Sequence, residues 1–202
     1  MTAPAPRTDL DADRALAARA ASGDRAAQRE VFARTKNAVH AVLYRILGSN
    51  REMEDLAQDS FVSIFRSIHG FRGESSLTTW CCTIATRVAW AHLERGRPTT
   101  TNLELVPEVP DGAPDAARVI AARLATQRVY AALDKLDPRL RVTFALAVLD
   151  ERPLAEVAGM TGASVVAVKT RLWRARRELA KRAAKDPALS DYLGNIDRGG
   201  AR

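Results

Sequence analysis

The sequence has 202 residues, which is long enough for one medium-sized domain or two small ones. With 47% hydrophobic and 27% charged residues it has the balance of a folded globular chain, so disorder throughout is excluded. The longest apolar stretch, residues 143–149, is much shorter than the roughly 18 residues that a bilayer span needs, and residues 1–12 lack the apolar core of a signal peptide. We therefore expect a cytoplasmic protein with no membrane insertion.

The net charge of +7 is concentrated in one part of the chain. Residues 123–185 hold 14 basic and 6 acidic side chains, whereas residues 1–97 hold 14 and 11, and residues 98–122 hold 1 and 4. A local excess of cations is typical of a surface that binds a phosphate backbone. The charge distribution thus predicts a nucleic-acid partner for the C-terminal third.

Catalytic and metal-binding patterns are missing from the sequence. The two cysteines, Cys81 and Cys82, are adjacent, so they form neither a disulfide framework nor a four-ligand zinc site, and we expect two buried thiols. His40, His69 and His92 have no triad or metal-ligand spacing with a cysteine or carboxylate, and no glycine-lysine phosphate loop occurs. We therefore expect no cofactor, no metal and no enzymatic activity.

The sequence predicts an all-α fold of two small helical domains joined by a flexible proline-rich linker. Ala, Leu, Arg and Glu dominate both halves, and no run alternates with the period of two that a strand needs. We place the domains at residues 14–97 and 123–185 and the linker at 98–122, because residues 98–115 hold four prolines and no helical period. Residues 1–13 and 186–202 lack periodic apolar positions and are predicted to be mobile tails.

In the N-terminal domain, residues 52–68 have the apolar period of an amphipathic helix. The positions predicted to face inward are Met53, Ala57, Phe61, Ile64, Phe65 and Ile68. The opposite face carries Asp55, Gln58, Asp59 and Val62. Acidic residues at a helix start can simply complement the helix dipole, but Asp59 lies beyond the first turn. The exposed patch is therefore open to two interpretations, a dipole effect or a surface that docks another protein.

The polar loop that follows, residues 71–76, leads into a second amphipathic helix that begins near Ser76. Gly73 in the loop permits close approach of another chain or of a base. We predict that Leu77, Cys81, Ile84, Val88 and Ala91 face inward and that Thr79, Cys82, Thr86, Trp90, Leu93 and Arg97 face outward. An outward Trp90 is either a stacking surface for unpaired bases or a residue that packs on a neighbouring helix.

The C-terminal domain contains a helix-turn-helix pattern. A short helix starts with Pro153 in its first turn, Thr161-Gly162-Ala163 interrupts it, and Ser164 is suited to cap the next helix. In that second helix Val165, Val168, Leu172, Ala175 and Leu179 recur at helical spacing and are predicted to face the core. Two helices joined by a short glycine-containing turn, the second one basic, form the arrangement that places a helix in the major groove.

The outward face of this second helix has the residue types that duplex DNA requires. Val166 can contact a thymine methyl group, Lys169, Thr170 and Arg171 can reach base edges, and Arg174 and Arg177 suit phosphates. The alternative is a helix pair that serves only as a packing unit with a solvated basic face. Seven cations against Glu178 alone between residues 164 and 182 favour DNA, because pairing within a helix needs both signs of charge.

Three segments in this order resemble a known family. They are EDLAQDSFVSIFRSI, HGFRGESSLTTW and, after the proline-rich linker, LDERPLAEVAGMTGASVVAVKTRLWRARREL. With the preceding helical segment GDRAAQREVFARTKNAVHAVLYRILGSN, they are similar to bacterial RNA polymerase sigma factors of the extracytoplasmic-function group over residues 14–184. The resemblance implies a region 2 domain that binds core polymerase and melts and reads the −10 promoter element, and a region 4 domain that reads the −35 element.

The resemblance also assigns residues. It implies that Asp55, Gln58 and Asp59, beside Val62, contact the β′ coiled coil of the polymerase. It implies contacts to melted −10 DNA from Phe71, Arg72, Gly73, Glu74, Ser75, Ser76 and Trp80. To these we add Arg87 and the outward Trp90 on the following helix as candidates for the same DNA. The resemblance places Lys169, Thr170, Arg171 and Arg174 on −35 DNA, and the outward face of the helix adds Val166 and Arg177. The sequence departs from the family where Arg87 replaces a usual asparagine, Ala91 an aspartate and Pro153 a serine.

The partners implied are core RNA polymerase, promoter DNA as duplex and as melted strand, and an anti-sigma factor that holds the protein inactive. The alternative is a free-standing helix-turn-helix regulator whose first domain senses or dimerises. Such a regulator would bind duplex DNA without polymerase and would not need the exposed Asp55 and Asp59 pair.

Overall fold

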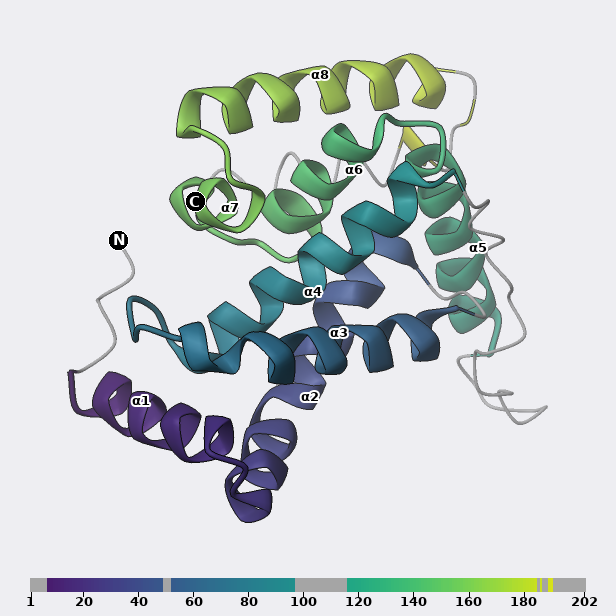
Figure 1. The fold of residues 1–202 in the computed structure, drawn as a ribbon. Helices are drawn as coiled ribbons and strands as arrows, with labels where there is room; N and C mark the ends of the chain where they lie inside the picture. Colours follow the sequence, from purple (N-terminus) through teal and green to yellow (C-terminus); the bar gives the residue numbers. More distant parts are fainter. Residues whose placement is uncertain (1–6, 49–51, 97–115, 185, 187–188, 191–202) are drawn as a thin grey trace.

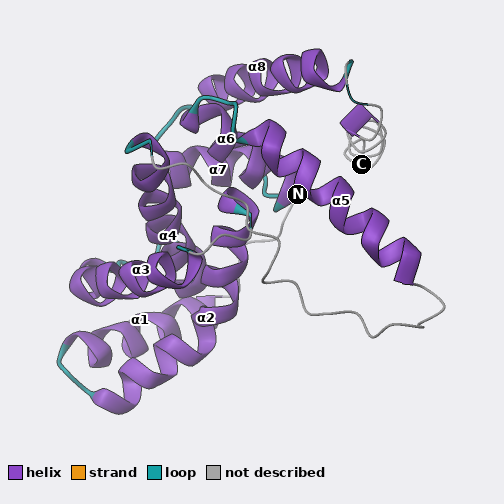
Figure 2. Cartoon of the chain, turned by 90° about the vertical axis from the view of Figure 1, so that its right-hand side faces the viewer, coloured by secondary structure: helices purple, strands orange, loops and turns teal. Residues whose placement is uncertain are grey.

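The computed structural model describes residues 7–48, 52–96, 116–184, 186 and 189–190. Every regular element in these ranges is helical, and none is a strand, so the all-α prediction is confirmed (Figure 2). The first domain contains α1 (Arg7–Ala21), α2 (Arg25–Leu47), α3 (Met53–Ser67), η1 (Ile68–Gly70) and α4 (Leu77–Glu94). The second contains α5 (Ala116–Leu133), α6 (Pro138–Phe144), the π-helical turn η3 (Ala145–Leu149), α7 (Leu154–Thr161) and α8 (Val165–Ala183).

Polar side chains fix the starts of several helices. Asp24 Oδ1 accepts hydrogen bonds from the N–H groups of Ala26 and Ala27 at 2.8 and 3.1 Å, and these bonds with Arg19 hold the pKa of Asp24 below its usual value. Ser76 caps α4 and Ser164 caps α8, each accepting at 3.1 Å from the residue three positions on. Because these caps satisfy N–H groups that have no partner inside the helix, local sequence sets where the helices begin.

Helix α1 begins at Arg7, inside the segment 1–13 that was predicted to be a tail. Leu16, Ala17 and Ala20 are buried in the first core, and α1 contacts α2. The carboxylate of Asp13 accepts a 2.7 Å hydrogen bond from the N–H of Leu77 at the start of α4. The helix therefore forms because tertiary contacts stabilise it, although its first turns lack an apolar period.

The other predicted boundaries also shift. Helix α5 begins at Ala116 rather than after residue 122, and residues 97–115 lie outside the described part of the chain. In the predicted C-terminal tail, Asp186 pairs with Arg128 at 3.0 Å and Leu189 is buried against the second domain, while residues 191–202 are not described. None of the described helices is both long and apolar enough to cross a bilayer.

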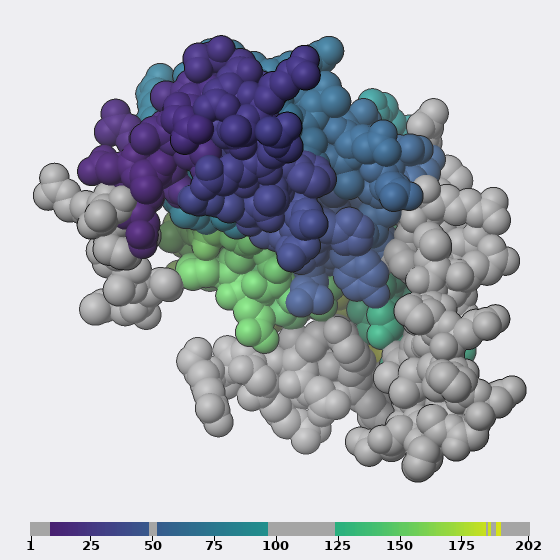
Figure 3. All heavy atoms as spheres, turned by 90° about the horizontal axis from the view of Figure 1, so that it is seen from below, coloured from purple at the N-terminus to yellow at the C-terminus, as the bar shows by residue number. Residues whose placement is uncertain are grey.

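The two domains pack against each other (Figure 1). One core joins residues of α1–α4 to residues of the second domain, among them Val142, Leu146, Val157 and Met160. A second core lies within the C-terminal domain, among α5, α6 and α8. In the space-filling view, blue atoms of the first domain lie directly against green atoms of the second (Figure 3).

This packing overturns part of the predicted orientation of α4. Cys82 and Thr86, which were predicted to face outward, are fully buried, and Ala91, which was predicted to face inward, is exposed. The reason is that α4 contacts α2 and α3 in its own domain and α6 and α7 in the other. A helix covered on two sides does not have the single apolar stripe that a helical wheel assumes.

Candidate nucleic-acid and protein interfaces

The turn between α7 and α8 has the geometry of a helix-turn-helix. Gly162 ends α7 in the left-handed conformation, with φ 62° and ψ 31°, where glycine has no steric penalty. Two residues later Ser164 caps α8. Pro153 lies at the N-cap of α7 and not in its first turn, because its ψ of 139° is extended.

Helix α8 presents a basic face to solvent. Val168, Ala175 and Leu179 are buried as predicted, whereas Val165 at the start of the helix is 38% exposed, which its predicted inward position did not anticipate. On the other side Val166 is 73% and Trp173 59% exposed. Lys169, Thr170, Arg174 and Arg177 are also exposed, and the Arg177 guanidinium lies 5.4 Å from the Trp173 ring centroid.

Arg171 has a different environment from its neighbours on α8. Its guanidinium carbon lies 6.0 Å from the ring centroid of Trp90 on α4, so it faces the first domain. Its Nη1 atom is buried and has no hydrogen-bond partner among the described residues. The structure thus brings one residue predicted for −35 DNA into contact with one predicted for −10 DNA.

Trp90 itself is half-buried, and its Nε1 donates a 2.9 Å hydrogen bond to Glu94. Two interpretations of Trp90 were open, base stacking and packing on a neighbouring helix. In this structure Trp90 packs on a neighbouring helix, α8, through Arg171. Arg87, one turn earlier, is exposed.

The loop before α4 is ordered by contacts within the first domain. Phe71 and Trp80 form an edge-to-face pair with centroids 5.5 Å apart. Gly73 has φ +74°, and a Cβ at this position would lie 2.4 Å from Cδ of Arg14, so the close approach predicted at Gly73 is made by α1 of the same chain. Arg72 and Glu74 are exposed, whereas Ser75 and Ser76 are half-buried.

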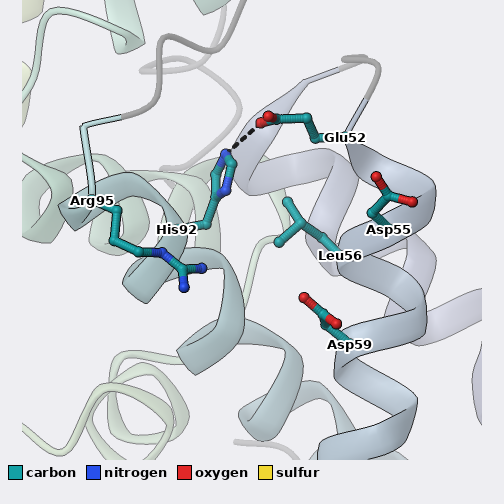
Figure 4. Close-up of a pocket in the computed structure, with 6 residues that line it drawn as sticks. All are labelled: Glu52, Asp55, Leu56, Asp59, His92 and Arg95. Atoms are coloured by element: carbon teal, nitrogen blue, oxygen red, sulfur yellow. Dashed lines mark ion pairs between the residues drawn. The ribbon is translucent and has the colours of Figure 1, made fainter.

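The acidic face of α3 is exposed as predicted. Asp55, Gln58 and Asp59 are exposed, and Val62 is 48% exposed. Beside them lies a cavity of about 250 Å³ between α3 and the end of α4, lined by Glu52, Asp55, Leu56, Asp59, His92 and Arg95 (Figure 4). The concentration of carboxylates makes this surface attractive to cationic side chains.

His92 lies in the wall of this cavity. Its side chain is 3% exposed, and its Nε2 lies 3.0 Å from a carboxylate oxygen of Glu52, so it is a structural residue that joins the end of α4 to the start of α3 (Figure 4). The helix spacing gave no signal of this pairing, since the two residues are 40 positions apart. In the described ranges no group of His, Cys, Asp and Glu could hold a metal ion.

Both cysteines are buried, in agreement with the sequence. Burial raises the pKa of the Cys81 thiol to about 12 and that of Cys82 to about 11. The Arg152 side chain lowers the pKa of Cys82 and so acts against burial. Helix α7, which begins two residues after Arg152, contacts α4.

Comparisons with known proteins match both halves of the chain. The family described as Sigma-70 region 2 matches residues 31–99, and the family described as Sigma-70, region 4 matches residues 126–179. The ECF RNA polymerase sigma factor SigG of Mycobacterium tuberculosis is 33% identical over 198 residues, which cover 87% of this chain and 52% of SigG. This chain therefore spans about half the length of that relative.

Other relatives match over nearly their whole length. The RNA polymerase sigma factor CnrH of Cupriavidus metallidurans is 31% identical over 179 residues, which cover 84% of this chain and 93% of CnrH. The ECF RNA polymerase sigma factor SigW of Bacillus subtilis is 27% identical, covering 79% of this chain and 90% of SigW. The chain belongs to the sigma-70 family of RNA polymerase sigma factors, in its extracytoplasmic-function (ECF) group.

The fold agrees with this assignment. The structure of CnrH in complex with the cytosolic domain of CnrY superposes with a TM-score of 0.61 and 28% identity, over 87% of this chain and 99% of that one. The sigma factor RpoE of Bartonella quintana, solved with the anti-sigma factor NepR, shares the fold with a TM-score of 0.54 at 21% identity. The predicted family resemblance is confirmed.

Proposed function

We propose that this chain is a specificity subunit that binds core RNA polymerase and directs it to promoters. Both sigma regions are present in one chain, and the observation that supports DNA recognition most directly is the exposed basic face of α8 after a left-handed glycine turn. The protein contributes no catalytic residue in this proposal, because nucleotide chemistry belongs to the polymerase. It would act in the cytoplasm, where its polymerase and DNA are found.

The polymerase contact is assigned to the exposed face of α3. Asp55, Gln58, Asp59 and Val62 combine negative charge with one apolar side chain, and none of the four is needed to close the core. We propose that they bind the β′ coiled coil. Complementary charge steers such encounters and fixes their orientation.

The −10 contacts are assigned to the loop at 71–76 and to Trp80, Arg87 and Trp90. Capture of a flipped base costs a few kcal/mol of unstacking, so the protein must supply a preformed pocket. Phe71 and Trp80, held together by their edge-to-face contact, support such a pocket beside the exposed Arg72. Arg87 is exposed on α4 and suits the strand backbone.

The −35 contacts are assigned to α8. Val166, Lys169 and Thr170 lie on its N-terminal half, the part of a recognition helix that reaches base edges in the major groove. Arg174 and Arg177 lie further along the exposed face and suit phosphates. Arg171 would join them once its contact with Trp90 is released.

A reconstituted transcription assay tests the proposal. The purified chain is added to core polymerase with genomic promoter fragments, and run-off products and promoter binding are measured with and without the polymerase. We expect promoter-specific products, with sequence-specific binding only when the polymerase is present. Specific duplex binding by the chain alone, with no gain from polymerase, would instead identify a free-standing regulator.

A protein partner that blocks these surfaces is a further part of the proposal. The neighbour CnrH was solved with the cytosolic domain of another protein, CnrY. We propose that an anti-sigma factor likewise holds this chain inactive. Constitutive activity in cells and purification without any stoichiometric partner would contradict this part alone.

A further inference from the structure

The first domain has a groove whose lining residues are assigned neither to DNA nor to polymerase. The groove has a volume of about 330 Å³ and lies between the start of α2 and the end of α3. Its lining residues are Arg25, Gln28, Arg29, Phe32 and Phe65. The start of α2 lies at the opposite end of the molecule from α8, so the groove is not a continuation of the basic face of α8 (Figure 1, Figure 2). We call it the α2 groove.

A row of three aromatic rings forms the apolar wall of the α2 groove. Phe32 is 44% exposed, although it is a large apolar residue. Its ring contacts that of Phe61 with centroids 4.6 Å apart, and Phe61 lies 6.4 Å from Phe65. Phe61 and Phe65 are half-buried and pack against the first core. The row therefore supports Phe32 from the core side and leaves much of its ring open to an apolar side chain of a partner.

Two arginines that have no ion-pair partner flank this wall. Of the four arginines on α2, Arg34 and Arg45 pair with carboxylates of the chain. Arg25 and Arg29 are exposed, and neither has such a partner among the residues that the structure describes. They are four positions apart, which is about one helical turn or about 6 Å along the axis. The α2 groove thus combines an apolar wall with two cations that the described chain does not neutralise.

This combination is complementary to an acidic segment of another protein. The planar guanidinium group of arginine matches the geometry of a carboxylate, and two cations one turn apart match two carboxylates one turn apart on a partner helix. A large apolar side chain between these carboxylates would fill the groove against Phe32 and Phe65. Such an arrangement is the mode of recognition in which an amphipathic helix lies in a groove.

Single-stranded nucleic acid also combines negative charge with apolar rings, but it fits the α2 groove less well. Helix α3, which supplies Phe65, also exposes Asp55 and Asp59, and these carboxylates repel a phosphate backbone that continues along the helix. The groove is lined by only two cations, whereas proteins that bind single strands have a basic surface that follows the backbone over several nucleotides. The charges around the groove therefore favour a protein segment.

We propose that the α2 groove binds an acidic amphipathic segment of a partner protein, which carries two carboxylates about one helical turn apart and a large apolar side chain between them. The carboxylates pair with Arg25 and Arg29, and the apolar side chain packs on Phe32 and Phe65. This inference does not rest on the proposed sigma function, because none of these four residues is assigned to polymerase or to DNA.

Binding of designed peptides to the full-length chain tests the proposal. The probe is a fluorescein-labelled helical peptide of alanine and glutamine that carries two glutamates one turn apart and a phenylalanine between them on the same face. One control peptide has glutamine in place of both glutamates, and another has alanine in place of phenylalanine. We expect saturable binding of the acidic peptide, followed by fluorescence anisotropy, and binding of each control peptide that is weaker by about fivefold or more.

Reversing the charge of the groove gives the decisive variant. The double variant Arg25→Glu, Arg29→Glu should weaken binding of the acidic peptide by about tenfold or more, because each exposed ion pair contributes up to about fivefold. The same variant should gain binding to a peptide that has lysine in place of both glutamates. Phe32→Ala should weaken binding of the acidic peptide by about fivefold. Both arginines are exposed, so the double variant tests the groove even if Phe32→Ala disturbs folding, which circular dichroism checks.

A single substitution elsewhere on α2 provides a matched control. Lys36 is exposed and lies outside the groove, and Lys36→Glu makes the same change of charge as Arg29→Glu. We expect Arg29→Glu to weaken binding of the acidic peptide and Lys36→Glu to leave it as in the wild type. Equal effects of the two substitutions would show that net charge, and not the groove, attracts the peptide, which would overturn the proposal.

Three other results would also overturn it. The first is equal affinity of the wild type for the acidic peptide and its glutamine control. The second is displacement of the acidic peptide by an oligothymidine, which would assign the groove to nucleic acid. The third is association of the free chain with itself that rises with concentration in sedimentation velocity and is abolished by Arg29→Glu. That result would make a second copy of this chain the occupant of the groove.

Discussion

The carboxylate of Asp13 in α1 accepts a 2.7 Å hydrogen bond from the N–H of Leu77, the first residue of α4. This bond links two segments 64 positions apart and supplies an acceptor to one of the helix N–H groups that have no partner within α4. It also places a negative charge at the positive end of the helix dipole. Helix α1 thus anchors the start of α4, which follows the loop at residues 71–76 and contains Trp80 in its first turn.

Asp13→Ala should lower the free energy of unfolding by about 1–2 kcal/mol, because a helix start loses its acceptor. Asp11→Ala is the control, since Asp11 is exposed on the same helix and carries the same charge. Urea unfolding followed by circular dichroism measures both. Equal stability of the two variants would show that the bond to Leu77 contributes nothing.

Asp59→Ala should weaken binding to core polymerase by about two- to fivefold, and the double variant with Asp55→Ala by about tenfold, because exposed charge pairs each contribute up to about 1 kcal/mol. The melting temperature should not change, since both side chains are exposed. Glu54→Ala on the same helix makes the same charge change outside the assigned surface. Fluorescence anisotropy measures the affinities. If the Asp59→Ala variant, the double variant and the Glu54→Ala control all bind polymerase equally well, the assigned face of α3 is not the docking surface.

Binding of the second domain to DNA should depend steeply on salt. If about four to six phosphates are contacted, the logarithm of affinity falls with the logarithm of salt concentration with a slope of about −3.6 to −5.4. Arg174→Ala should make the slope shallower by about 1, whereas Lys36→Ala on α2 should leave it unchanged. A salt titration in the presence of polymerase compares the variants with the wild type, because polymerase adds the same contribution to each slope. An Arg174→Ala slope equal to that of the wild type would contradict a phosphate contact by α8.

Two glycines with positive φ should respond differently to alanine. Gly162 has open space around its Cβ position, so Gly162→Ala should cost only the left-handed backbone penalty of about 1 kcal/mol. Gly48 has φ 74° and ψ −170°, which is nearly restricted to glycine, and its Cβ would also overlap Tyr130. Gly48→Ala should therefore cost about 2–3 kcal/mol or more, and thermal unfolding that ranks the two in the opposite order would contradict the packing at Gly48.

The buried cysteines should make the protein sensitive to alkali. Their folded pKa values, about 12 for Cys81 and about 11 for Cys82, lie above the ordinary value of 9.0, because burial disfavours the thiolate. A raised folded pKa stabilises the protein below pH 9 and this contribution is lost as pH rises toward 11–12, by at most about 1.4 kcal/mol per pH unit for each thiol. The Cys81→Ala, Cys82→Ala double variant should lose less stability between pH 9 and 11 than the wild type, as measured by urea unfolding.

Local signals in the sequence predicted much of this structure. The glycine turn at 162, the cap at Ser164, the exposed Val166 and the acidic face of α3 all follow from rules that act within one or two helical turns. The same rules misplaced Cys82 and Thr86, because a wheel cannot show that a second domain covers the other side of α4.

Long-range pairings account for the rest of what sequence reasoning missed. Arg141 is counted in the positive charge of the C-terminal third, yet it is buried and bonded to the end of α2. Asp13 lay in a predicted tail, and the contact between Glu52 and His92 joins residues far apart in the chain. No single-sequence pattern distinguishes these side chains from solvated ones.

The core shared between the domains constrains how this protein can change. Val157 and Met160 of the helix-turn-helix complete the same apolar cluster as Cys82 and Ala85 of α4. A substitution that enlarges one side therefore needs a compensating reduction on the other. A chimera could join the C-terminal domain of a relative to the N-terminal domain of this chain. Its residues at this shared apolar cluster would have to match in size for the two domains to pack without exposing the cluster to water.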